Sequence, residues 1–153
     1  MKDEFLKYLE SIGMTKTLCK RVETIYEFYK EICPDKITGI FVTDYIKGDG
    51  SREYENLWFF STKYCMEAAN FITADHFDMA PIAKRVFRWE IKKQDYDFKK
   101  ATEKSRLSLE FDMSGAGPGG VSGYLKASKG NCDHLKDIIL KYVVPNLIES
   151  EIA

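Results

Sequence analysis

The spacing of apolar residues divides the chain into a helical zone, a strand-like zone and a second helical zone. In the first zone, apolar residues recur at steps of three and four, which predicts two helices. Gly13 is a plausible stop for the first of them, and the short link that follows predicts a helical hairpin. The first helix has its apolar positions at Phe5, Leu6, Leu9 and Ile12.

The second predicted helix has the cleaner apolar stripe. Thr15 or Thr17 is placed to cap its first turn, and Pro34 ends it because proline cannot continue a helix. A stripe on one helix face predicts burial, either in the core or in a seam between copies of the chain. The stripe, and with it the candidate oligomer seam, contains Leu18, Val22, Ile25 and Tyr29, and Ile32 extends it.

From Ile37 onward the pattern changes to short runs of β-branched and aromatic residues, which predicts about six or seven strands. Asp49-Gly50 is a strong signal for a hairpin turn between the first two. Residues 75–83 are interpreted as a loop or a short edge piece. The strand-like runs are 37–46, 52–61, 64–72, 84–93, 106–113 and 123–128; in the fourth, Phe87, Trp89 and Ile91 share one face.

The last zone predicts one amphipathic helix. Asn131 or Asp133 is placed to cap its start, and Pro145 is expected to kink or end it. Its apolar stripe contains Leu135, Ile138, Ile139, Tyr142 and Val143. Helices, then antiparallel strands, then a helix predict an α+β fold in which an N-terminal helical hairpin precedes an antiparallel bent sheet or half-barrel. We expect a single domain over 1–153, with the hairpin at 1–33 and the sheet plus C-terminal helix at 37–148.

Four segments carry a resemblance to the bacterial pleckstrin-homology-like family. They are NLWFFSTKYCMEA (56–68), APIAKRVFRWEIKK (80–93), RLSLEF (106–111) and NCDHLKDIILKYVVPNL (131–147). The resemblance implies a bent antiparallel sheet or half-barrel closed by a C-terminal helix, and the hairpin at 1–33 is a departure from it. The alternative is the helix-grip fold of START-like ligand binders, which normally begins with a strand. The nuclear-transport-factor-like cone also begins with helices, but it ends in strands, and the predicted C-terminal helix of this chain therefore argues against it.

Composition agrees with a globular domain, since 44% of the 153 residues are hydrophobic and 31% are charged. The formal net charge of −1 argues against a general binder of nucleic acid or membrane surfaces. Residues 84–106 are locally basic, with nine Lys and Arg against four Asp and Glu. We interpret this stretch as a solvated surface, with nucleic-acid contact as the alternative. The candidate patch comprises Lys84, Arg85, Arg88, Lys92 and Lys93.

Several features bear on location. The opening MKDEFLKYLE does not resemble a secretory signal, and no apolar run approaches the roughly 20 residues of a membrane helix. The four cysteines lack the close spacing of metal or redox motifs, which predicts free thiols. We therefore expect a cytoplasmic protein.

The candidate chemistry is sparse. Gly115, Gly117 and Gly120 match a G-x-G-x-x-G pattern, but a strand-like run follows where a nucleotide-binding loop needs a helix. His76 and His134 have no second compact ligand pair at zinc spacing, and His134 is interpreted as helix surface. We therefore assign no catalytic, cofactor-binding or metal-binding residue.

The sequence thus predicts a non-catalytic interaction module whose partner is another protein or a second copy of itself. In pleckstrin-homology domains that bind phosphoinositides, basic residues crowd the first hairpin. Here that hairpin carries Lys47, Asp49, Arg52 and Glu53, whose charges cancel, so phosphoinositide binding is not expected. The alternative is a small hydrophobic-ligand carrier or enzyme, with a helix-grip cavity lined by Trp58, Phe60, Phe87, Trp89 and Phe111.

Overall fold

The computed structural model describes residues 1–85, 88–112 and 122–147, and confirms the α+β class with an N-terminal helix pair, seven strands and a C-terminal helix. The elements are α1 (Asp3–Ser11), α2 (Lys16–Ile32), β1 (Gly39–Ile46), β2 (Arg52–Phe60), β3 (Tyr64–Ala69), β4 (His76–Pro81), α3 (Ile82–Arg85), β5 (Arg88–Gln94), β6 (Arg106–Asp112), β7 (Ser122–Ser128), α4 (Asn131–Ile138) and the π-helical turn η1 (Ile139–Val143).

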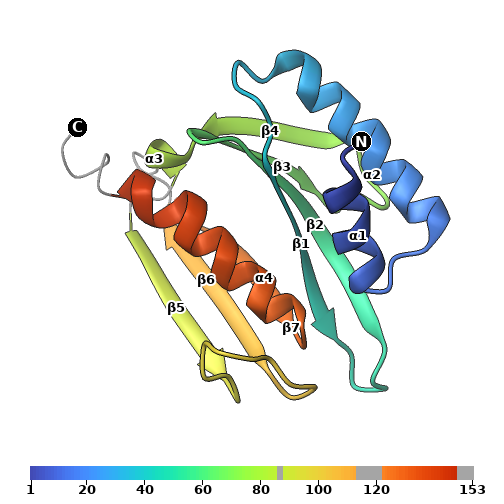
Figure 1. The fold of residues 1–153 in the computed structure, drawn as a ribbon, viewed down its shortest axis with the longest axis vertical. Coiled ribbons are helices and arrows are strands. Elements are labelled where there is room, and N and C mark those ends of the chain that lie inside the picture. Colours follow the sequence, from blue (N-terminus) through green and yellow to red (C-terminus); the bar gives the residue numbers. More distant parts are fainter. Residues whose placement is uncertain (86–87, 113–121, 148–153) are drawn as a thin grey trace.

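The strands form two antiparallel sheets. Sheet A has the order β1-β2-β3-β4, and sheet B has the order β5-β6-β7. Helices α1 and α2 cover one face of sheet A, while α4 lies across sheet B beside β1 (Figure 1). β7 contacts β1 without forming a ladder with it in the described part of the chain. The segment at 75–83, expected to be a loop or edge piece, contributes β4, which is an edge strand of sheet A.

The two N-terminal helices begin and end where the local residues dictate. Gly13 has a φ of +82°, a left-handed conformation that favours glycine, and it follows the end of α1. The hydroxyl of Thr15 accepts a hydrogen bond from the Leu18 amide at 3.3 Å and caps α2. Pro34 lies just beyond the end of α2 and cannot continue it.

The stripe on α2 packs within its own chain. Val22, Ile25 and Tyr29 are each at most 1% exposed against the helix-facing side of sheet A, and only Leu18 is half-buried. The residues proposed as an oligomer seam therefore form core, because the sheet of the same chain covers them. On α1, Leu6 is exposed, and Tyr8 takes the buried position beside Leu9.

An irregularity between β1 and β2 changes which face the β2 side chains take. Val42 pairs with Leu57, but Asp44 pairs with Tyr54, so β2 holds one extra residue between these pairs. The extra residue shifts the alternation of β2 by one position. On one side of the irregularity, Leu57 packs with the helices. On the other side, Tyr54 and Arg52 take that face and bond to the Ile12 carbonyl at the end of α1.

Aromatic rings fill the space between the two sheets and α4. Trp58 lies edge-on to Phe111, with ring centroids 6.0 Å apart, and Phe60 stacks on Tyr142 at 5.1 Å. All four side chains are almost completely buried in one cluster. This packing favours a core role for Trp58, Phe60 and Phe111, which the helix-grip alternative would place around a cavity. Trp89 is only partly buried, and Phe87 lies outside the described residues.

The C-terminal helix differs from the expectation at both ends. Asn131 and Asp133 do not cap it, because Asn131 bonds to β1 and Asp133 accepts from the Tyr96 hydroxyl at 2.6 Å. Pro145 does not end it: the π-helical turn η1 precedes the proline, and helical backbone continues to residue 147. A proline has no N–H for the carbonyl one turn earlier, so a widened turn before it is a common accommodation.

Two further expectations concern particular parts of the chain. The glycine pattern at Gly115, Gly117 and Gly120 lies outside the described residues. Among the described helices, none has both the length and the apolar character needed to cross a membrane.

Gly39 tests the packing of the C-terminal helix on β1. A Cβ added there would lie 2.6 Å from the Tyr142 ring, so we expect Gly39→Ala to lower the free energy of unfolding by about 1–3 kcal/mol. Gly48→Ala is the matched control, since nothing lies within 4 Å of its added Cβ, and it should stay within about 1 kcal/mol of the wild type. Urea unfolding measures both. Equal stabilities for the two variants would contradict this packing.

Candidate functional site

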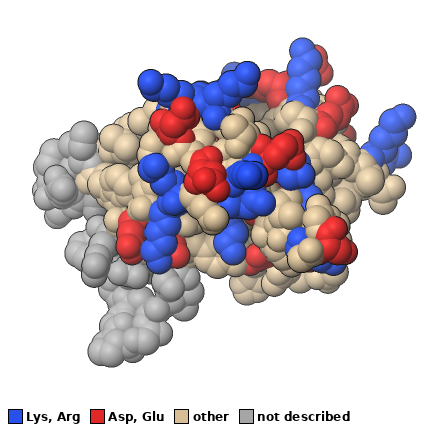
Figure 2. Space-filling model, turned by 90° about the horizontal axis from the view of Figure 1, so that it is seen from below, with Lys and Arg blue, Asp and Glu red and all other residues tan. Residues whose placement is uncertain are grey.

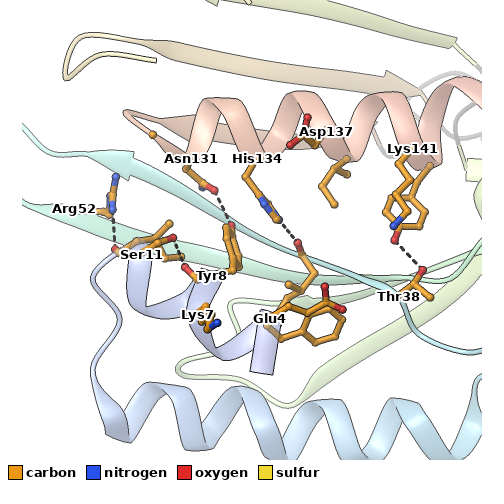
Figure 3. Close-up of a pocket in the computed structure, with 16 residues that line it drawn as sticks. Glu4, Lys7, Tyr8, Ser11, Thr38, Arg52, Asn131, His134, Asp137 and Lys141 are labelled. Carbon is orange, nitrogen blue, oxygen red and sulfur yellow. Dashed lines mark hydrogen bonds between the residues drawn. The ribbon is translucent and has the colours of Figure 1, made fainter. Parts of the chain in front are cut away.

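A groove of about 600 Å³ lies between α1 and α4, with β1 along its floor (Figure 3). The groove begins at Thr38, passes Ile40 and ends at the side chain of Asn131, whose amide donates to the Val42 carbonyl. Four residues of strand correspond to about 13 Å, so the groove has the length of a short extended peptide. The side chains that carry its polar chemistry are Glu4, Lys7, Tyr8, Ser11, Thr38, Arg52, Asn131, His134, Asp137 and Lys141.

Three side chains on the floor cap the open edge of β1. The Val42 amide donates to the Tyr8 hydroxyl at 3.0 Å, and the Asn131 amide donates to the Val42 carbonyl at 2.9 Å. His134 Nε2 lies 2.6 Å from the Ile40 carbonyl oxygen, which it can reach only as a donor. An edge strand exposes unpaired backbone groups, and here residues from two helices satisfy them.

The fully buried carboxylate of Asp44 lies behind this floor and joins several elements. Oδ1 accepts from the Ser128 amide at 3.0 Å and from Asn131 Nδ2 at 2.8 Å, and Oδ2 accepts from the Ser128 hydroxyl. Arg52 Nε lies 2.9 Å from Oδ2, and Arg52 Nη1 donates to the Ile12 carbonyl at the end of α1. One side chain thus ties β1 to β2, to the end of β7 and to the start of α4, and through Arg52 it is linked to the end of α1.

Tyr8 links this network to the groove. Its hydroxyl donates to Asn131 Oδ1 at 2.7 Å, and its ring stacks on His134 with centroids 3.8 Å apart. Burial raises the pKa of Tyr8 well above its ordinary value of 10, so the hydroxyl stays protonated and can donate. Burial lowers the pKa of His134 below 6.5 and outweighs its hydrogen bond to Ile40, which acts in the opposite direction. The floor is therefore uncharged where these two rings meet.

The walls of the groove, by contrast, carry both signs of charge. Glu4 and Lys7 project from α1, Asp137 projects from α4 and Lys141 from η1, and all four are solvent-exposed (Figure 3). A neutral floor between walls of mixed charge can recognise a polar ligand that carries both an acidic and a basic group.

The predicted basic patch is only partly within the described side chains. Lys92 pairs with Glu110 at 3.2 Å, and Lys93 Nζ donates to the Tyr96 carbonyl at 2.9 Å. Both line a depression of about 380 Å³ together with Arg106 and Lys126. The side chains of Lys84, Arg85 and Arg88 lie outside the described part. On the face shown in Figure 2, acidic and basic residues are interspersed.

The cysteines and histidines are the candidates for thiol and metal chemistry. All four cysteines are free, and burial raises the pKa of the Cys132 thiol to about 12, which keeps it protonated. His134 is occupied by β1, and His76 lies on the edge strand β4. Within residues 1–85, 88–112 and 122–147, no three His, Cys, Asp or Glu side chains converge on a point where a metal could bind.

The residues that build this groove are not evident from the sequence. Its pattern predicts that His134 lies on the helix surface, whereas His134 is half-buried between β1 and Tyr8. Asp44 had a usable signal, because it is the one acid within the apolar run ITGIFVTDYI and a buried acid needs partners. Tyr8 also had one, since it lies three residues after Phe5 on the same helix face.

Comparison with known proteins gives no relative for this chain. No protein-family model matches it, and neither a curated protein nor a solved structure is significantly similar to it.

Asp44→Asn should be strongly destabilising. The amide keeps the shape of the carboxylate but removes the charge opposite Arg52 and one acceptor for the donors around it. Breaking a buried ion pair of this kind costs about 3–5 kcal/mol, measurable by urea unfolding. Glu53→Gln is the control, because Glu53 pairs with Lys47 at the surface and should change stability by less than about 1 kcal/mol. A loss for Asp44→Asn no larger than that of the control would contradict the role assigned to Asp44.

His134 predicts a pH dependence of stability. Because its pKa is lowered in the folded state, the unfolded chain binds more protons below 6.5, and stability should fall as the pH drops from 6.5 to about 5. His134→Gln has no titrating group there and should lose less stability over this interval. Denaturant midpoints are measured for both proteins at several pH values. The contributions of His76 and the carboxylates are common to both proteins and cancel in the difference between their stabilities. Parallel curves would show that His134 is not held neutral by the fold.

Proposed function

We propose that the chain is a non-catalytic interaction module that binds a short segment of another protein in the groove between α1 and α4. The observation that carries the proposal is the groove itself, with a neutral, fixed floor between walls of mixed charge. Its volume of about 600 Å³ is in the range of protein sites that enclose small ligands or peptide segments.

Side-chain recognition suits this groove better than strand addition. The Val42 amide and the carbonyls of Val42 and Ile40 are already bonded to Tyr8, Asn131 and His134, which disfavours pairing of a peptide strand with this edge. A bound segment would lie along the floor and place its charged side chains against the two walls. Because hydrogen bonds hold the floor in place before binding, its side chains would lose little conformational entropy on association.

The same bonds argue for a binding role and not a catalytic one. A general base or nucleophile needs a free reactive atom within reach of the substrate. Here the hydroxyl of Tyr8 and Nε2 of His134 are both engaged with β1, which leaves Nδ1 as the one ring nitrogen of His134 that could act as a base. The aromatic packing between the sheets likewise gives little support to the alternative of a hydrophobic-ligand carrier or enzyme.

The pleckstrin-homology-like assignment and the cytoplasmic location remain part of the proposal. An antiparallel sheet followed by a C-terminal helix is compatible with the first. Four free thiols are compatible with a reducing compartment.

Selection of random displayed peptides on the full-length protein tests the groove. Peptides that carry both charge signs should be enriched, and Lys7→Glu and Asp137→Lys should each weaken the best peptide by about tenfold, because each reverses one wall charge. Titration calorimetry measures the affinities. Both residues are exposed, so the variants should keep the wild-type fold.

Lys20→Glu provides the matched control, since Lys20 is exposed on α2 and does not line the groove. It should bind the selected peptide as tightly as the wild type. If the two wall variants also bind it as tightly as the wild type, or if no peptide is enriched, the groove is not the binding site.

A further inference from the structure

The two edges of sheet A are treated differently by the fold. At the β1 edge, side chains of α1 and α4 bond to the backbone and block pairing with another strand. At the other edge, β4 pairs with β3 and lies at the end of the sheet order in the described part of the chain. Natural proteins usually protect such edges with lysines, bulges or covering elements. β4 (HFDMAP) contains no lysine, has its one proline only at its last position, and pairs regularly with β3.

Apolar side chains are exposed next to this open edge. Phe28 and Ile32, one turn apart on α2, are 44% and 45% exposed, and Met79 on β4 is 38% exposed. Phe28 packs against Phe77 of β4 with ring centroids 5.4 Å apart. The one proton of the Tyr29 hydroxyl is shared between the carbonyls of Glu67 at 2.8 Å and Asp78 at 3.2 Å, which holds α2 over β3 and β4. We call Phe28, Ile32, Phe77 and Met79 the edge patch. Exposed apolar side chains gathered at a sheet edge mark an association surface.

We propose that β4 pairs antiparallel with β4 of a second copy of this chain, so that two sheets A join into one continuous sheet. A two-fold axis perpendicular to the sheet keeps the helix-bearing faces on the same side. The two edge patches then lie side by side and cover each other. Residues directly opposite in an antiparallel pair share a face, so only registers centred on a residue preserve the inward and outward positions of both strands.

The side chains of β4 select one of these registers. Centring on Asp78 would place two carboxylates opposite each other, and centring on Met79 would bring Pro81, which has no N–H, opposite Phe77. Centring on Phe77 avoids both problems. It places His76 of each copy opposite Asp78 of the second copy, a complementary donor and acceptor, and it pairs the two Phe77 rings on the face of the edge patch. β4 is thus complementary to itself in this register, which identifies a second copy as the occupant.

Sedimentation velocity over a dilution series of the full-length protein is the test. The wild type should pass from dimer to monomer on dilution. His76→Asp places like charges opposite each other twice in the dimer and should raise the dissociation constant at least about tenfold. The exchange variant that combines His76→Asp with Asp78→His restores the complementary pairs and should restore the dimer. Ile32→Glu should also weaken it through the edge patch.

Leu140→Glu is the control, because Leu140 is 57% exposed on the C-terminal helix and lies outside the edge patch. It should dimerise like the wild type, and circular dichroism checks the fold of every variant. A wild type that is monomeric at every concentration would overturn the proposal. A wild type that does not self-associate but binds a strand of a different protein at β4 would also overturn it. So would a His76→Asp variant that dimerises normally, or a folded exchange variant that stays monomeric.

Discussion

The arrangement of the whole molecule depends on one buried carboxylate. Asp44 is completely enclosed, and an isolated charge in such a place would be too costly to keep. The fold offsets this cost with an arginine of β2, the hydroxyl and backbone amide of Ser128 at the end of β7, and the side-chain amide of Asn131 on α4. Because each partner must be in place for the charge to be tolerated, Asp44 fixes how sheet B and the C-terminal helix sit against sheet A. β1 and β7 share no ladder in the described chain, so the bonds to Ser128 supply one polar link between the sheets, beside the hydrogen bond from Tyr124 to Glu55.

The groove follows from the same constraint. Asn131 bonds to Asp44, to the β1 backbone and to Tyr8, so the network behind the floor also positions the residues of the floor. Arg52 connects Asp44 to the end of α1, which forms one wall of the groove. The groove is thus preformed by interactions needed for folding, and its exposed wall charges can vary without disturbing the fold. That separation of a fixed floor from free walls is what an interaction module requires.

Much of the fold could be predicted from the sequence because its signals are local. The apolar spacing of α2, the glycine after α1 and the Asp49-Gly50 turn act within a few residues, and the structure confirms each. The site could not be predicted because it depends on contacts between distant segments. Tyr8 and Asn131 are 123 residues apart, and the irregularity that turns Arg52 toward Asp44 breaks the alternation on which strand predictions rest. Asn131 also resembled a helix cap by its position, but the tertiary contact with β1 takes its side chain.

Native-state hydrogen exchange of the Ser128 and Val42 amides tests the central claim most directly. Both donate to side chains, the first to the carboxylate of Asp44 and the second to the hydroxyl of Tyr8. If the Asp44 network holds the sheets and the groove floor together, both amides should exchange only through global unfolding, with the free energy shown by the central strands of sheet A. Exchange of either amide by local opening, while β2 and β3 stay protected, would contradict this account.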